Sequence, residues 1–131
     1  MIEIPNSIVE HLYRQAEETA PAEACGYLAG QENHVMRYYP MRNMDQSPDH
    51  FTLDPAEQFE IMKSARKGGF KILAVYHSHP QTAARPSEED IRLAFDPNIL
   101  YVIVSLADQK KDIQAFKIKN QVVSMERVEI V

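Results

Sequence analysis

Apolar side chains recur along the chain with two different periods, and the period changes from one segment to the next. Between residues 7 and 19 they recur every three to four positions, which predicts an amphipathic helix. Asn6 or Ser7 is expected to cap the start of this helix, and a short strand is expected before it at residues 2–4. The side of the helix expected to be buried carries Ile8, Leu12 and Ala16.

A β-hairpin is predicted by two apolar segments that are separated by a polar turn. Residues 24–29 form the first segment, which ends at Gly30, and residues 34–41 form the second. The Gln-Glu-Asn sequence between them is typical of a turn that reverses the chain. The two segments are therefore expected to pair as neighbouring strands.

A second helix is indicated by a strong start signal. Asp54 stands at the N-cap position, Pro55 follows at the first helical position, and Glu57 stands at the third. Gly68 and Gly69 are expected to end this helix. The residues expected on its inner side are Phe59, Met62 and Ala65.

The remaining segments complete a predicted sheet. Residues 70–77 are almost continuously apolar, as in a central strand buried on both faces, and residues 100–106 predict another buried strand. A short helix is expected at residues 88–95. Residues 113–119 and 122–128 alternate between apolar and polar side chains, as in half-exposed antiparallel strands. This order of elements predicts an α+β fold with helices on the faces of a sheet.

Composition and charge narrow the classes of protein that fit these elements. The chain has 131 residues, 44% of them hydrophobic, which suits a single domain over residues 1–131. A formal net charge of −5 disfavours binding to nucleic acid or to an anionic membrane surface. No apolar stretch has the roughly 20 residues of a membrane span, and Cys25 is the only cysteine, so no intramolecular disulfide can form. A cytoplasmic location is therefore expected, and the formation of a homo-oligomer is left open.

Two histidines and an aspartate have the spacing of metal ligands. Because side chains alternate along a strand, His77 and His79 project from one face at the end of the predicted central strand, and Ser78 projects from the other. Asp90 follows on the first turn of the next predicted helix, after a loop long enough to return to the strand end. Two His and one Asp leave a fourth tetrahedral position open, which is the pattern of a catalytic rather than a structural zinc site.

Each part of this cluster also has an ordinary structural interpretation. His77 and His79 are compatible with a simple polar strand end. Ser87 and Asp90 have the spacing of a capping box at the start of a helix. The occurrence of both parts at the carboxyl end of the same buried strand favours the metal site.

A hydrolytic zinc site also needs a general base that does not bind the metal. Glu23 is a candidate, because it stands directly before a predicted strand at a position where neither solubility nor capping requires a carboxylate. The alternative is an ordinary solvated loop glutamate. Cys25 is interpreted as a small buried apolar residue rather than a nucleophile.

The candidate residues, taken in order, resemble the motif of a known family. Glu23, the His-Ser-His-Pro segment at residues 77–80 and the Ser-Glu-Glu-Asp segment at residues 87–90 are similar to the JAMM, or MPN-plus, motif E…H-x-H-P…S-x-x-D. Residues 21–28 resemble the P-x-E-x-C-G-x-L segment of that family. Asn43, with Phe51, Asp54 and Pro55, is similar to the segment between the loop and the helix in its small bacterial members.

This resemblance implies a fold, a metal and a set of roles. The implied fold is a mixed, mostly antiparallel curved sheet flanked by helices, with a layout similar to that of the nucleobase deaminases. His77, His79 and Asp90 would bind one Zn²⁺ per chain. Glu23 would accept a proton from water and deliver it to the leaving amine. Ser87 would donate a hydrogen bond to the tetrahedral oxyanion, a role that competes with capping for the same hydroxyl.

The same resemblance implies a reaction. A small prokaryotic member of this family is expected to be a zinc-dependent peptidase or isopeptidase that cleaves after the C-terminal Gly-Gly of a ubiquitin-like or sulfur carrier protein. The alternatives are a general small-peptide zinc hydrolase and a non-catalytic MPN scaffold that binds partners. A nucleobase deaminase is excluded, because its signature requires two cysteines in P-C-x-x-C and this chain has one.

Overall fold

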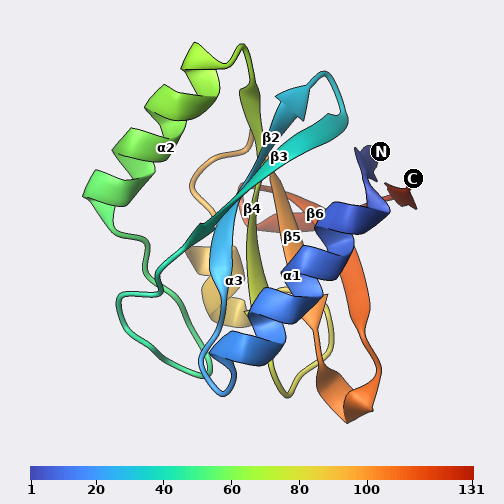
Figure 1. Cartoon of the computed structure of the whole chain (residues 1–131). Helices are drawn as coiled ribbons and strands as arrows, with labels where there is room; N and C mark the ends of the chain where they lie inside the picture. The colour runs from blue at the N-terminus through green and yellow to red at the C-terminus, as the bar shows by residue number, and fades with distance from the viewer.

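One sheet and a set of helices make up the structure, a computed structural model that describes residues 1–131 (Figure 1). The helices are α1 (Asn6–Thr19), α2 (Pro55–Lys67), α3 (Glu88–Arg92) and the short 3-10 helix η1 (Ala107–Gln109). The strands are β1 (Ile2–Ile4), β2 (Cys25–Gln31), β3 (His34–Met41), β4 (Lys71–His79), β5 (Leu100–Ser105), β6 (Asp112–Lys119), β7 (Val122–Glu126) and β8 (Val128–Ile130). None of the helices has the length and apolar composition that crossing a membrane would require.

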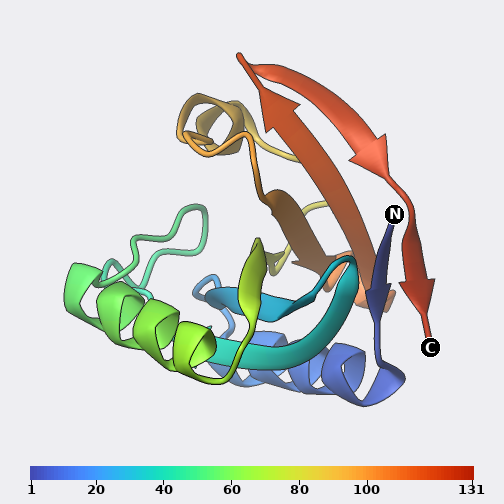
Figure 2. The ribbon, with the colours of Figure 1, turned by 90° about the horizontal axis from the view of Figure 1, so that it is seen from above.

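The eight strands form one mixed sheet in the order β7-β6-β5-β4-β2-β3-β1-β8. Four neighbouring pairs are antiparallel, whereas the pairs β4–β5, β1–β3 and β1–β8 are parallel. β7 and β8 are consecutive in the chain but lie at opposite ends of this order, and a strong curl of the sheet brings these ends together (Figure 2). The predicted α+β fold with a curved, mostly antiparallel sheet is confirmed.

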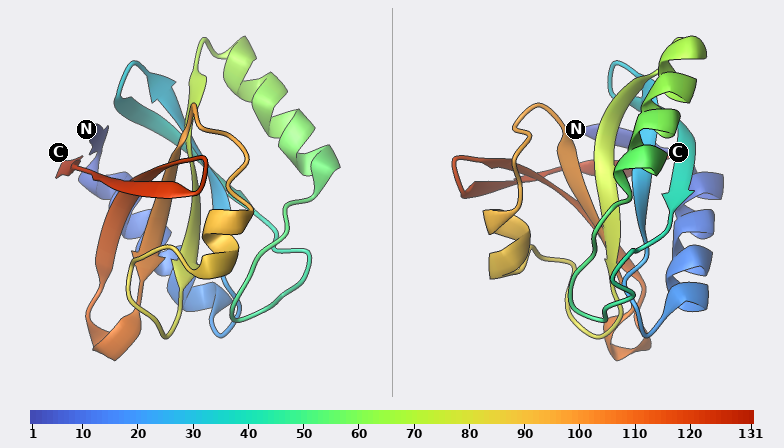
Figure 3. Two further views of the ribbon diagram at one scale, coloured as in Figure 1. Left: turned by 180° about the vertical axis from the view of Figure 1, so that it is seen from behind. Right: turned by 90° about the vertical axis from the view of Figure 1, so that its left-hand side faces the viewer.

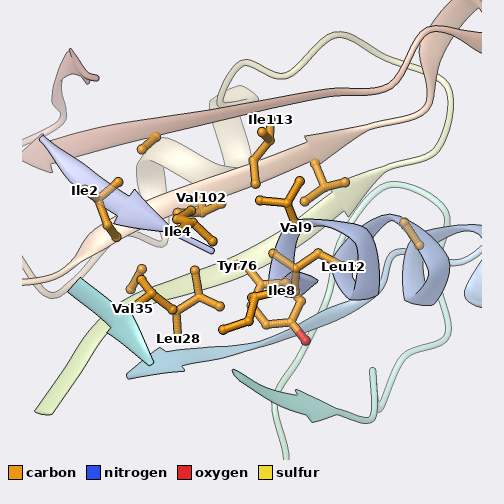
Figure 4. Close-up of a cluster of buried hydrophobic side chains, with 14 residues drawn as sticks. Ile2, Ile4, Ile8, Val9, Leu12, Leu28, Val35, Tyr76, Val102 and Ile113 are labelled. Carbon is orange, nitrogen blue, oxygen red and sulfur yellow. The ribbon is translucent and has the colours of Figure 1, made fainter. Parts of the chain in front are cut away.

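Alternation along the central strand β4 separates the two faces of the sheet. Ala74 and Tyr76 belong to the largest apolar cluster, in which α1 packs against one face (Figure 4). Val75 belongs to a second cluster on the opposite face, which includes Ile61 of α2. A third cluster places Ile91 of α3 on that same opposite face. In the left view of Figure 3, α3 lies in front of the sheet and α1 behind it.

The hairpin of β2 and β3 is confirmed, with a tighter turn than the sequence predicts. Gln31 pairs with His34, so only Glu32 and Asn33 make the turn, and Glu32 has a φ of 53°. The start and end of α2 are also confirmed, because the Asp54 carboxylate accepts a hydrogen bond from the N–H of Ala56 and the helix stops before Gly68.

The predicted cap of α1 is wrong. The helix starts at Asn6 after Pro5 at the N-cap position, and no side chain caps it. The Asn6 side chain bonds to Glu10 instead. The backbone supplies the missing partners, because the N–H of Asn6 donates to the carbonyl of Val131 and the N–H of Ile8 donates to Pro5.

At two of the three positions predicted for the inner side of α2, the preceding residue faces inward instead. Phe59 and Met62 are 64% and 43% exposed, and only Ala65 of the expected residues is buried. The inner side instead carries Ile61, which packs on the second apolar cluster, and Gln58, whose Nε2 donates to the Tyr27 hydroxyl. A polar side chain thus takes an inward position that an apolar periodicity cannot indicate.

Two further boundaries differ from the prediction. α3 ends at Arg92, before residue 95. The segment expected as one strand at residues 122–128 is divided, because β7 pairs with β6 whereas β8 leaves it to pair with β1.

Candidate active site

His77 and His79 lie at the carboxyl end of β4, which is flanked on both sides by β2 and β5. Both histidines are buried, at 2% and 5% exposure. His77 pairs in register with Cys25 of the second apolar cluster, so the histidines project toward the face covered by α2 and α3. Ser78 points to the opposite face, as the alternation in the sequence predicts.

The structure brings Asp90 of α3 to the two histidines. The His77 Nε2 and His79 Nε2 atoms are 3.1 Å apart, and Asp90 Oδ2 lies 3.1 Å from the first and 3.2 Å from the second. A tetrahedral zinc ion with bonds of about 2.0–2.1 Å separates its ligand atoms by about 3.3 Å. The three atoms therefore have nearly the spacing of the ligands on one face of a zinc tetrahedron. His77, His79 and Asp90 together could hold one metal ion.

Hydrogen bonds and a ring contact with residues outside the cluster orient these side chains. The His79 Nδ1 lies 2.9 Å from the carbonyl of Ala83, to which it donates in the tautomer that leaves Nε2 free for a metal. The His77 ring stacks on Phe51, with 4.7 Å between ring centres. The predicted capping box is also present, because Ser87 Oγ accepts from the N–H of Asp90 while Asp90 Oδ2 accepts from the N–H of Ser87. The capping and metal-binding interpretations of Ser87 and Asp90 therefore describe one arrangement.

Electrostatics distinguish the three side chains of the cluster. Burial disfavours a charged carboxylate, but the hydrogen bonds from His77 and His79 prevail and hold the pKa of Asp90 well below its ordinary value. Burial lowers the pKa of His77. For His79 burial acts in the same direction, but its bonds to Asp90 and Ala83 outweigh it and raise the pKa. A neutral imidazole and an ionised carboxylate are the forms in which these side-chain types can bind a metal ion.

Glu23 lies across from the end of the histidine strand. The antiparallel register ends with Cys25 opposite His77. Hydrogen bonds between Ala24 and Ser78 continue the contact beyond it, and Glu23 is the next residue along that segment. The Glu23 side chain is 3% exposed, and its Oε1 atom has no hydrogen-bond partner. Burial raises the pKa of this carboxyl to about 8, partly opposed by the nearby His79. Glu23 is therefore a buried acid held close to the cluster, and the interpretation as a solvated loop residue is wrong.

An apolar pocket adjoins the cluster of His77, His79 and Asp90. His77 and Asp90 form part of its wall. The other lining residues include Phe51, Leu93, Tyr101, Ile103 and Ile118. The cluster is therefore bordered by a largely apolar wall.

Two polar residues support the site in ways that the sequence did not reveal. Ser78 bonds to the backbone of Ala24, and Asn43 bonds to the backbone of Glu23. The sequence offered no local signal for either bond, because the partners are far apart along the chain. Cys25 is placed as predicted, since its thiol is buried against the Met41 carbonyl and burial raises the pKa of the thiol to about 12.

Comparison with known families gives one match over most of the chain. Residues 5–119 match the family described as prokaryotic homologs of the JAB domain. The CysO-cysteine peptidase of Mycobacterium tuberculosis is 34% identical over 132 residues, which cover 98% of this chain and 88% of that protein. The desampylase of Haloferax volcanii is 34% identical over 103 residues, which cover 76% of this chain and 74% of that protein.

Solved structures share the fold. A protein from Desulfitobacterium hafniense, known from a solution structure, superposes with a TM-score of 0.92 and 43% identity over 100% of this chain and 93% of that one. A JAB1/MPN domain protein from Archaeoglobus fulgidus superposes with a TM-score of 0.67 and 20% identity over 99% of this chain and 97% of that one. The second likeness concerns the fold alone, and it agrees with the fold that the JAMM resemblance implies.

Proposed function

The chain belongs to the family of prokaryotic homologs of the JAB domain, and on that premise we propose that it is a zinc-dependent peptidase that cleaves after the C-terminal Gly-Gly of a ubiquitin-like or sulfur carrier protein. One observation carries the proposal: three ligand atoms converge beside a buried carboxyl group that has a free oxygen. A scaffold that only binds partners has no need of this combination.

The donor set suits zinc. His77, His79 and Asp90 would hold the ion, since two imidazoles and one carboxylate at tetrahedral spacing are a typical catalytic ligand set with one position left open. Zinc bound there would act as a Lewis acid and would lower the pKa of water toward 7. We propose one ion per chain, because the chain offers one such group.

Glu23 is assigned the proton transfers. Its pKa of about 8 places the carboxyl close to the working range of a general base at neutral pH, and its Oε1 has no partner within the protein. It would accept a proton from the attacking water and deliver that proton to the leaving amine. A positioned base of this kind contributes about 10²- to 10⁴-fold in rate.

Ser87 is assigned to the oxyanion. Its Oγ accepts the N–H of Asp90, and this bond uses a lone pair rather than the hydroxyl proton. The proton therefore remains available for donation to the oxygen that gains charge in the tetrahedral intermediate. From the sequence alone, helix capping and oxyanion stabilisation are competing roles of the Ser87 hydroxyl. Because capping uses its oxygen and oxyanion stabilisation would use its proton, Ser87 can be assigned both roles.

The substrate class follows from the relatives and from the chemistry of glycine. One relative is named as a peptidase of CysO-cysteine and another as a desampylase. Glycine has no side chain, so an extended Gly-Gly tail can bring its carbonyl close to a buried cluster through a narrow passage. The released group would be a single amino acid, such as cysteine, or a short extension.

A comparison of two substrates tests this proposal. The zinc-loaded protein is incubated with a ubiquitin-like carrier protein extended by Gly-Gly-Cys and with the same carrier extended by Ala-Ala-Cys, and the products are weighed by mass spectrometry. We expect loss of cysteine from the first substrate only, and no loss with the Glu23→Gln variant. Equal cleavage of both would contradict the Gly-Gly preference, and cleavage of neither would contradict the substrate class.

A further inference from the structure

Asn43 is buried in the loop between β3 and α2, although this loop contains neither helix nor strand. Its Nδ2 atom donates to the carbonyl of Glu23 at 3.1 Å and to the carbonyl of His50 at 3.0 Å. Its Oδ1 atom accepts from the N–H groups of Asp45 and Thr52, each at 3.1 Å. Every donor and acceptor position of the amide is therefore used.

The same loop holds Glu23 from its other side. The N–H of Glu23 donates to the carbonyl of Ser47 at 2.8 Å, so both backbone polar groups of Glu23 are bonded to this loop. The carboxyl group differs, because its Oε1 has no partner. The loop thus fixes the backbone of Glu23 and leaves the side chain available to a reactant.

Asn43 is also connected to the metal ligands through the loop. Its Oδ1 holds the N–H of Thr52, and the preceding residue, Phe51, stacks on the ring of His77. One buried amide therefore bonds the segment that carries the candidate base and the segment that covers a candidate ligand. A change in this amide would move the two groups relative to each other.

We propose that Asn43 is a positioning residue that sets the place of the Glu23 carboxyl relative to the His77, His79 and Asp90 cluster. The inference rests on the proposed function, because it takes Glu23 as the general base. A base must lie within hydrogen-bond reach of the proton that it accepts, and a displacement of about 1 Å can reduce turnover about 100-fold.

Two variants of Asn43 test the donor bonds. Asn43→Asp keeps the size and one acceptor oxygen but replaces the donating Nδ2, and Asn43→Ala removes the whole amide. With the Gly-Gly-Cys carrier we expect kcat to fall about 10- to 100-fold for both, with little change in KM and unchanged zinc content. Thr52→Val is the matched control, because it removes the hydroxyl bond to Asp45 in the same loop but keeps the N–H that bonds Asn43. The control should retain wild-type kcat.

A double-mutant cycle separates positioning from a general structural role. In the Glu23→Asp background the shorter side chain already displaces the carboxylate, so Asn43→Ala should reduce kcat much less there than in the wild type. The proposal is overturned by an equal loss in both backgrounds or by a loss of zinc in proportion to activity. Wild-type kcat in Asn43→Asp, or a failure of both Asn43 variants to fold, would also overturn it.

The failure of this inference is distinguishable from failure of the proposed function. If Glu23→Gln retains wild-type turnover, the proposed role of Glu23 is wrong. If Glu23→Gln is inactive while the Asn43 variants are fully active, only the positioning role of Asn43 is wrong.

Discussion

Ala24 and Ser78 exchange two hydrogen bonds across the site. The N–H of Ala24 donates to the Ser78 hydroxyl oxygen at 2.7 Å, and the N–H of Ser78 donates to the Ala24 carbonyl at 2.9 Å. Ser78 stands between the two candidate metal-binding histidines, and Ala24 follows the candidate base Glu23. This pair therefore fixes the segment of the base directly to the strand of the ligands.

Loss of the Ser78 hydroxyl should destabilise the protein. Ser78→Ala leaves the N–H of Ala24 without its partner in a buried place, and an unsatisfied buried donor costs about 1–3 kcal/mol. Urea unfolding should show a lower free energy of unfolding by that amount. Ser124→Ala, at an exposed position of β7, is the control and should be close to neutral. Equal stability of Ser78→Ala and wild type would show that this bond does not hold the segment.

Zinc content should depend on the three converging side chains. We expect about one zinc per chain in the wild type and a sharp loss in His77→Ala and in Asp90→Ala, because each substitution removes one of the three proposed ligands. Elemental analysis after metal removal and reloading measures the content. His34→Ala changes an exposed histidine outside the cluster and should keep the zinc. A wild-type protein that binds no zinc would contradict the proposed mechanism.

Glu23→Gln should separate metal binding from turnover. The amide is close in size to the carboxyl but cannot accept the proton, so zinc and fold should persist while cleavage of the Gly-Gly-Cys carrier is lost. Parallel elemental analysis and product mass spectrometry test this. If the variant loses its zinc, Glu23 is a ligand and its assignment as a base is wrong.

Ser87→Ala should reduce turnover while zinc remains bound. Loss of an oxyanion donor lowers kcat by about 10²- to 10³-fold. Loss of the cap costs about 1 kcal/mol of stability, because Ser87 accepts the N–H of Asp90. Ser87→Thr keeps the hydroxyl and should recover most of both properties. A Ser87→Ala variant with wild-type kcat and reduced stability would leave capping as the only role of this residue.

The pH dependence of stability should show the burial of Glu23. In metal-free protein, burial raises the pKa of this carboxyl from 4.5 to about 8, so between these values the folded state keeps a proton that the unfolded state has released. Stability contributed by this group therefore falls as pH rises from about 4.5 to about 8. Glu23→Gln removes that dependence.

Thermal unfolding in the presence of a chelator measures this effect. The melting temperature of Glu23→Gln relative to wild type should increase between pH 5 and pH 8, and titrating groups far from Glu23 cancel in the comparison. If the difference in melting temperature between Glu23→Gln and wild type stays constant from pH 5 to pH 8, Glu23 is already ionised in the folded protein over this range.

Local sequence signals determined those elements of the fold that depend on near neighbours. Asp54 and Pro55 start α2, and Glu32 lies in the turn of the hairpin, because capping and turn formation involve residues only a few positions apart. The alternation along β4 likewise places His77 and His79 on one face. The same local reasoning was wrong where a distant partner intervened, as at Asn6, whose N–H bonds to Val131 at the other end of the chain.

The identity of the candidate site residues and the return of Asp90 to the two histidines could be predicted from the sequence, but the burial of Glu23 beside them could not. Ala24 and Ser78 are 54 positions apart, and only the antiparallel pairing of β2 with β4 brings Glu23 next to the histidines. The burial that raises the pKa of Glu23, and the saturation of the Asn43 amide, arise from packing between these distant segments. Residue type and spacing thus determined which chemistry was available, and long-range strand pairing decided where the groups that perform it meet.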